Sequence, residues 1–116
     1  MDVKTTVKMS LKHFNFKEFD SPDFEGSGEL YMDRDFLRAL DKARELSNGT
    51  PFRITSAYRT PEKNRAIYKS LGIPEIKSSH LVGKAVDIAA PTSRDRFNIV
   101  SALIKAGLNR IGISAK

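Results

Sequence analysis

The chain contains no cysteine. This absence excludes disulfide frameworks, thiolate metal sites and cysteine nucleophiles, so histidine and carboxylate side chains are the ligands left for a transition metal. Histidine is also scarce, with His13 and His80 alone. No stretch approaches the roughly 20 apolar residues that a membrane-spanning helix needs. The first residues, MDVK, lack the apolar core of a secretory signal, so we expect a cytoplasmic product, or one that leaves the cell by another route such as phage lysis.

A length of 116 residues is enough for one hydrophobic core and too short for two, so we expect a single domain. The net charge of +6 favours polyanionic partners in general, such as nucleic acid or an anionic bacterial wall. Phe14, Phe16 and Phe19 alternate with polar residues around Lys17. Such aromatics can stack on bases or, as is commoner, anchor an N-terminal arm to the core. No helix-turn-helix or zinc-finger spacing is present, so no nucleic-acid partner is expected.

Apolar spacing and turn residues predict three helices and a few short strands. The predicted helices are 33–47, 60–70 and 92–106, the strands are 52–57 and 85–90, and a last strand starts within 108–113. Residues 1–29 predict a short extended piece followed by a loop. The third helix is expected to bury Phe97, Val100, Leu103 and Ile104 on one face. Without a regular βαβ rhythm, these elements indicate an α+β fold with a small, mainly antiparallel sheet packed with about three helices.

The segment 78–88 (SSHLVGKAVDI) places an imidazole and a carboxylate seven residues apart. Histidine and aspartate are both good zinc ligands. Gly83 would let the backbone reverse, so that His80 and Asp87 point at one centre. Val86 and Ile88 would bury the Asp87 carboxylate, which then needs a cation or a hydrogen-bond partner. Taken alone, the pair also fits a hydrogen-bonded structural histidine and an aspartate paired with an arginine.

A second segment, 54–64 (ITSAYRTPEKN), precedes the first in the chain. Together, the two segments closely resemble the zinc D-Ala-D-Ala carboxypeptidase family of peptidoglycan peptidases, which includes VanY-type enzymes and phage endolysins. The family shares its fold with the hedgehog signalling domain. The resemblance extends to 110–113 (RIGI) and, more loosely, to 16–19 (FKEF), so it spans most of the chain.

The resemblance implies that His80 and Asp87 bind zinc. It places Arg59 at the mouth of the site, where its guanidinium would hold a substrate carboxylate or polarise the scissile carbonyl, and Ser78 in the substrate cleft. The alternatives are a surface ion pair for Arg59 and a turn hydrogen bond for Ser78. The implied reaction is hydrolysis of a peptidoglycan stem peptide, at a D-Ala-D-Ala terminus or at an L-Ala-D-Glu type bond.

One part of the family pattern is missing. Family members carry a third zinc ligand, a histidine, in a strand shortly after the Ile-Gly-Ile segment, but this sequence ends with Ser114-Ala115-Lys116. His13 lies in the N-terminal arm, where a surface or packing role is expected. Three explanations stand: a chain cut short of its final strand, which we prefer; a natural variant that serves as a wall-binding or phage structural module; or a third ligand from a neighbouring chain or solvent.

Overall fold

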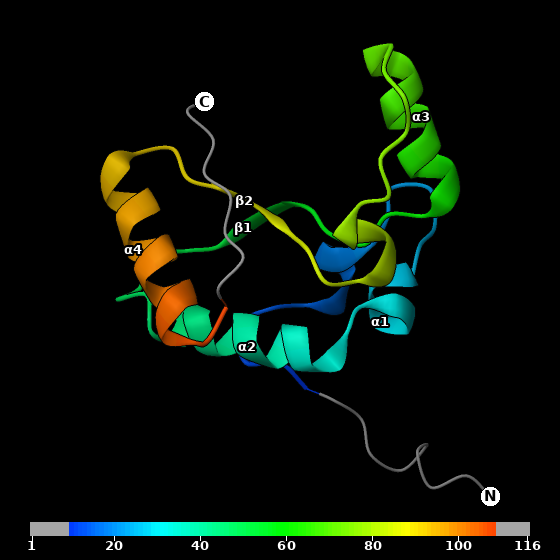
Figure 1. The fold of residues 1–116 in the computed structure, drawn as a ribbon. Coiled ribbons are helices and arrows are strands. Elements are labelled where there is room, and N and C mark those ends of the chain that lie inside the picture. Colours follow the sequence, from blue (N-terminus) through cyan, green and yellow to red (C-terminus); the bar gives the residue numbers. More distant parts are fainter. Residues whose placement is uncertain (1–9, 109–116) are drawn as a thin grey trace, which may run out of the picture.

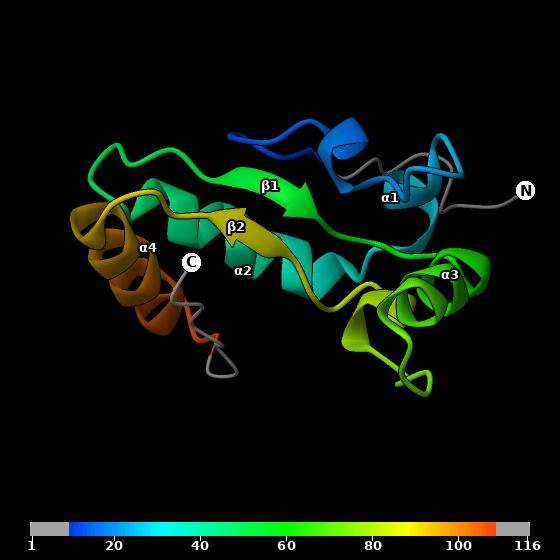
Figure 2. The ribbon, with the colours of Figure 1, turned by 90° about the horizontal axis from the view of Figure 1, so that it is seen from above.

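The computed structural model describes residues 10–108 of the chain. An antiparallel pair of strands lies over one long helix, with a further helix at each end of the pair (Figure 1, Figure 2). In chain order the elements are η2 (Phe16–Phe19), α1 (Ser27–Tyr31), α2 (Arg34–Glu45), β1 (Arg53–Ser56), α3 (Pro61–Leu71), η3 (Ser79–Val82), β2 (Asp87–Ala89) and α4 (Ser93–Lys105), where η marks a 3₁₀ turn. The predicted small α+β fold is confirmed. The strand expected to start within 108–113 falls, from residue 109 on, outside the described residues.

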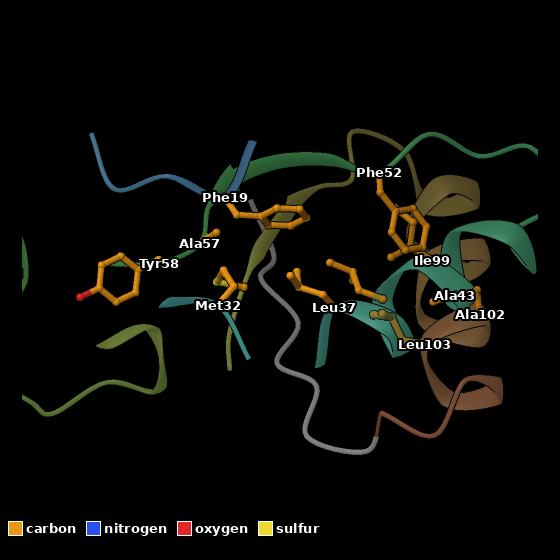
Figure 3. Close-up of a cluster of buried hydrophobic side chains, with 11 residues drawn as sticks. Phe19, Met32, Leu37, Ala43, Phe52, Ala57, Tyr58, Ile99, Ala102 and Leu103 are labelled. Atoms are coloured by element: carbon orange, nitrogen blue, oxygen red, sulfur yellow. The ribbon is translucent and has the colours of Figure 1, made fainter. Parts of the chain in front are cut away.

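The core lies between the strands and α2 and continues to α4 (Figure 3). Phe19, Leu37 and Leu40 are fully buried. Burial of each such side chain contributes about 1.5–3 kcal/mol, so this layer fixes how the strands sit over α2. None of the helices in residues 10–108 is long and apolar enough to cross a lipid bilayer.

The N-terminal arm is anchored by its aromatic side chains. The Phe14 ring lies 5.4 Å from the ring of Phe19 and 6.4 Å from that of Phe52. Core anchoring is therefore the role of this stripe, and the fully buried Phe19 is unavailable for stacking on bases. The predicted extended piece is instead the 3₁₀ turn η2, because Asn15 and Glu18 form a capping box around it.

The helix ends follow the sequence signals closely. The Asp33 side chain accepts a hydrogen bond from the backbone N–H of Phe36 and caps α2, while Thr60 caps α3 in the same way. Gly72 ends α3 in the left-handed conformation with φ +72°. The helices α2, α3 and α4 were predicted, whereas α1 begins within the stretch 1–29, the end of which was predicted to be a loop.

The predicted buried face of α4 is wrong in part. Phe97 is 71% exposed and Ile104 is 61% exposed, whereas Ile99, Ala102 and Leu103 are buried. The buried residues are spaced three and four apart and form one stripe, which is the face that packs against α2. Phe97 and Ile104 are seven residues apart and lie on a neighbouring stripe. The apolar pattern located the helix correctly but did not select the face that α2 covers.

Candidate active site

His80 is held in the short turn η3 by its backbone and by its ring. The backbone N–H of His80 donates to the Ser78 hydroxyl, 3.1 Å away. The ring atom Nδ1 lies 2.6 Å from the carbonyl oxygen of Ala57, just beyond β1. A carbonyl oxygen only accepts, so Nδ1 donates in this contact and Nε2 of the neutral ring keeps its lone pair. Metal-binding histidines are typically oriented by such a bond from the second ring nitrogen.

Asp87 begins β2, opposite the end of β1. The strands pair Ile54 with Ile88 and then Ser56 with Asp87, so Thr55 forms a bulge between them. The Thr55 hydroxyl donates to the backbone carbonyl of Asp87 at 3.2 Å. A bulge re-aims the side chains that follow it. Here it accompanies the approach of Asp87 to the histidine, since Oδ2 of Asp87 lies 3.7 Å from Nε2 of His80.

Gly83 makes the turn between the two residues, as the sequence predicted. It has φ +71°, a backbone conformation that residues other than glycine rarely adopt. Its carbonyl accepts a hydrogen bond from the backbone N–H of Asp33 at 2.9 Å. A Cβ atom at this position would overlap the carbonyl oxygen of Tyr31 and lie 2.6 Å from the Cα of Met32. The turn is therefore packed directly against the backbone that joins α1 and α2.

The two side chains differ in exposure. The His80 side chain is 11% exposed, but that of Asp87 is 59% exposed. The prediction that Val86 and Ile88 bury the carboxylate is therefore wrong. Successive residues of a strand point to opposite faces, and the sheet of the described residues has only two strands. Ile88 packs against the core, so Asp87 faces the side away from it.

The donor pair fits a divalent metal such as zinc. The Nε2 lone pair and the Asp87 carboxylate are both electron donors, and at 3.7 Å they face each other without a hydrogen atom between them in the neutral ring. Two ligands of a tetrahedral zinc, each bonded at about 2.0–2.2 Å, lie roughly 3.3–3.5 Å apart. A cation between the two atoms would relieve their repulsion with little movement. Within residues 10–108, no cluster of three histidine or acidic side chains completes a site.

The backbone of Arg59 lies beside that of His80. Its backbone N–H donates to the carbonyl of His80 at 3.1 Å, and its guanidinium atom Nη1 donates to Oδ1 of Asn64 at 2.9 Å. The buried Nε has no partner among the described residues. The alternative of a surface ion pair is not observed in the described part of the chain, because the partner of the guanidinium is a neutral amide.

Ser78 makes the turn hydrogen bond, which is the alternative to a substrate contact. Its hydroxyl oxygen accepts from the backbone N–H of His80 and caps η3. The hydroxyl hydrogen is not engaged by this bond, so the group retains one donor. Ser78 is half-buried, so a substrate contact through that donor stays a prediction.

Two groups of the site were not identified from the sequence. The Ala57 carbonyl belongs to the backbone, and no side-chain pattern announces it. Asn64 lies in the segment 54–64, but its role becomes visible only through its complete burial and its bond to Arg59. The available signal was an uncharged amide between Lys63 and Arg65.

A sequence model of the family described as Peptidase M15 matches residues 12–116. No significant match was found among curated proteins or among solved structures. The matched range includes both segments that carry the site, 54–64 and 78–88. Because the match covers far more than half of the chain, this chain belongs to the peptidase M15 family, whose members are in general zinc-dependent peptidases.

Proposed function

We propose that this protein hydrolyses peptide bonds in bacterial peptidoglycan stem peptides with the help of a zinc ion held by His80 and Asp87. The reaction would be that of a D,D-carboxypeptidase or of an endolysin-type endopeptidase. The observation that carries the proposal is the 3.7 Å approach of Nε2 of His80 to Oδ2 of Asp87, with the ring oriented by Ala57. Membership of the peptidase M15 family supports the reaction class.

Arg59 is the residue we propose for substrate binding and for charge stabilisation. Its guanidinium can donate charge-assisted hydrogen bonds to a peptide carboxylate, or to the oxygen that gains negative charge during amide hydrolysis. The backbone bond from Arg59 to the His80 carbonyl, which holds the two residues side by side, supports this assignment. We assign the remaining donor of the Ser78 hydroxyl, which caps the same turn, to a second substrate contact.

When bound, zinc supplies Lewis acidity, which activates water and polarises a peptide carbonyl. Two protein ligands define a site less tightly than the three usual in catalytic zinc centres. We therefore expect His80 and Asp87 alone to bind zinc more weakly than a three-ligand site.

The test is zinc analysis of the purified protein, with His80→Ala and Asp87→Asn as loss-of-ligand variants. The chain offers a matched control in His13, whose Nε2 also lies close to a carboxylate, 3.8 Å from Oε1 of Glu45. We expect one zinc per chain in the wild type and in His13→Ala, and a loss of at least tenfold in affinity in either ligand variant. Release of D-Ala from a D-Ala-D-Ala peptide, or cleavage of an L-Ala-D-Glu peptide, would identify the bond.

Retention of zinc in His80→Ala would contradict the proposal, as would equal losses in His80→Ala and His13→Ala. The alternative function is a catalytically impaired wall-binding or phage structural module on the same fold. It is favoured by the presence of only two candidate ligands in the described part of the chain. Binding of this protein to peptidoglycan, with neither bound zinc nor hydrolysis, would support this alternative.

A further inference from the structure

Asn64 is a fully buried amide whose hydrogen-bonding groups all reach the site or the segment that leads to it. Its exposure is 0%. Oδ1 accepts from Nη1 of Arg59 at 2.9 Å, while Nδ2 donates to Oε2 of Glu75 at 2.7 Å and to the carbonyl of Ile76 at 3.0 Å. A buried amide without partners costs free energy. This one is fully satisfied and joins three segments of the chain.

These bonds link the guanidinium to the loop that enters η3. Glu75 and Ile76 lie shortly before Ser78 and His80, and Arg59 contacts His80 through its backbone. We propose that Asn64 is a positioning residue, which fixes the direction of the Arg59 guanidinium relative to the His80–Asp87 pair and holds the 75–76 loop against it. This inference rests on the proposed function for its catalytic meaning, because a fixed guanidinium matters for a substrate that it binds.

The chemistry of the amide explains why asparagine suits this position. An amide accepts from Arg59 and donates to Glu75 at the same time, whereas a carboxylate can only accept. Asn64 therefore separates the guanidinium from the Glu75 carboxylate. With a neutral partner, Arg59 keeps its full positive charge for a substrate oxygen, which a direct ion pair would partly compensate.

The first experiment compares Asn64→Ala with the wild type. In ¹⁵N–¹H NMR spectra, we expect the Arg59 guanidinium to give resolved Nη–H signals in the wild type and averaged ones in the variant, because the held rotamer is lost. For a stem peptide we expect kcat/KM to fall by roughly 10- to 100-fold, the worth of a hydrogen bond to a charged group. Zinc affinity should stay within about twofold of the wild type, because neither metal ligand contacts Asn64.

The matched control is Asn98→Ala. The Asn98 side chain donates to the Thr50 hydroxyl at 3.0 Å, on α4 and away from Arg59. The Asn98→Ala variant should therefore give the same Arg59 signals and the same kcat/KM as the wild type. If Asn64→Ala is too unstable to study, the pair Asn64→Asp with Glu75→Gln retains an acceptor for Arg59 and reverses the hydrogen bond to residue 75, while the bond to the Ile76 carbonyl is lost. In this double variant we expect the resolved Arg59 signals to return.

Arg59 signals that stay resolved in Asn64→Ala, or that stay averaged in the double variant, would overturn the inference. The NMR readout needs neither zinc nor turnover, so it decides the inference independently of the proposed function. If the Arg59 signals behave as expected but the protein neither binds zinc nor cleaves peptides, only the proposed function is contradicted. Zinc binding and hydrolysis with wild-type kinetics in Asn64→Ala would sink the inference alone.

Discussion

Replacement of Gly83 by alanine tests whether close backbone packing holds the His80 turn in place. Gly83 has φ +71°, and a Cβ atom there would overlap the backbone at Tyr31 and Met32. The left-handed conformation costs a residue with a Cβ about 1–2 kcal/mol, and overpacking adds about 1–3 kcal/mol. Since the overlapping atoms are backbone, they cannot rotate away. We expect Gly83→Ala to lower the free energy of unfolding by about 2–5 kcal/mol.

The matched control is Gly72→Ala, at the end of α3. Gly72 has φ +72°, almost the same as Gly83, but its added Cβ would meet no heavy atom within 4 Å. This variant should show the conformational cost alone, about 1–2 kcal/mol. Urea denaturation followed by circular dichroism measures both changes as shifts of the midpoint at constant slope. The difference between the two variants isolates the contact of the turn with the α1–α2 junction.

The same comparison reports on the site. Relief of the overlap requires the turn to move away from Tyr31, and His80 lies three residues before Gly83 within that turn. Folded Gly83→Ala protein should therefore bind zinc less tightly than Gly72→Ala protein. Equal destabilisation by the two substitutions would refute the reasoning, because a Cβ atom at position 83 would then fit without contacting the backbone of Tyr31 and Met32.

Two further predictions concern stability. The Ser21 hydroxyl, and next the Thr60 hydroxyl, donate hydrogen bonds to the Asp23 carboxylate and lower its pKa. These bonds therefore stabilise the folded protein at pH values above the pKa that Asp23 has in the unfolded chain. This contribution to the free energy of unfolding is lost as the pH falls through the lowered pKa of Asp23 in the folded protein. In urea titrations at several pH values, Asp23→Asn should make the free energy of unfolding fall less steeply at acidic pH. The same fall in the variant as in the wild type would contradict the assignment. Phe19→Ala should cost about 3–5 kcal/mol, because the side chain is fully buried, whereas the exposed Phe97→Ala should change the unfolding free energy by less than about 0.5 kcal/mol; similar costs would refute the core assignment.

The local part of the fold could be predicted from sequence because its signals act over a few residues. Asp33 and Thr60 cap helices through hydrogen bonds to residues three positions later, and Gly72 ends α3 by its own backbone freedom. The capping box in η2 is equally local, but the aromatic alternation around Phe16 favoured an extended reading. There the hydrogen bonds of Asn15 and Glu18 outweigh the apolar pattern.

The non-local part could not be predicted in the same way. Which stripe of α4 is buried depends on how α2 approaches it, and the exposure of Asp87 depends on how many strands flank β2. The spacing of apolar residues within one segment predicts neither the buried face of α4 nor the exposure of Asp87. The closeness of His80 and Asp87 was predicted correctly, since a glycine turn and a seven-residue separation restrict where the chain can go.

The donor pair is positioned mainly by backbone groups, with the Ser78 and Thr55 hydroxyls as the side-chain contributions. The Ala57 carbonyl orients the His80 ring, the β1–β2 pairing with its bulge sets Asp87, and the Gly83 turn docks on the α1–α2 junction. Backbone groups remain when a ligand side chain is replaced. The turn should therefore survive His80→Ala and Asp87→Asn, so a loss of zinc in those variants measures missing ligands and not a collapsed site. Gly83→Ala makes the opposite change, since it keeps both ligands and removes the support that brings them together.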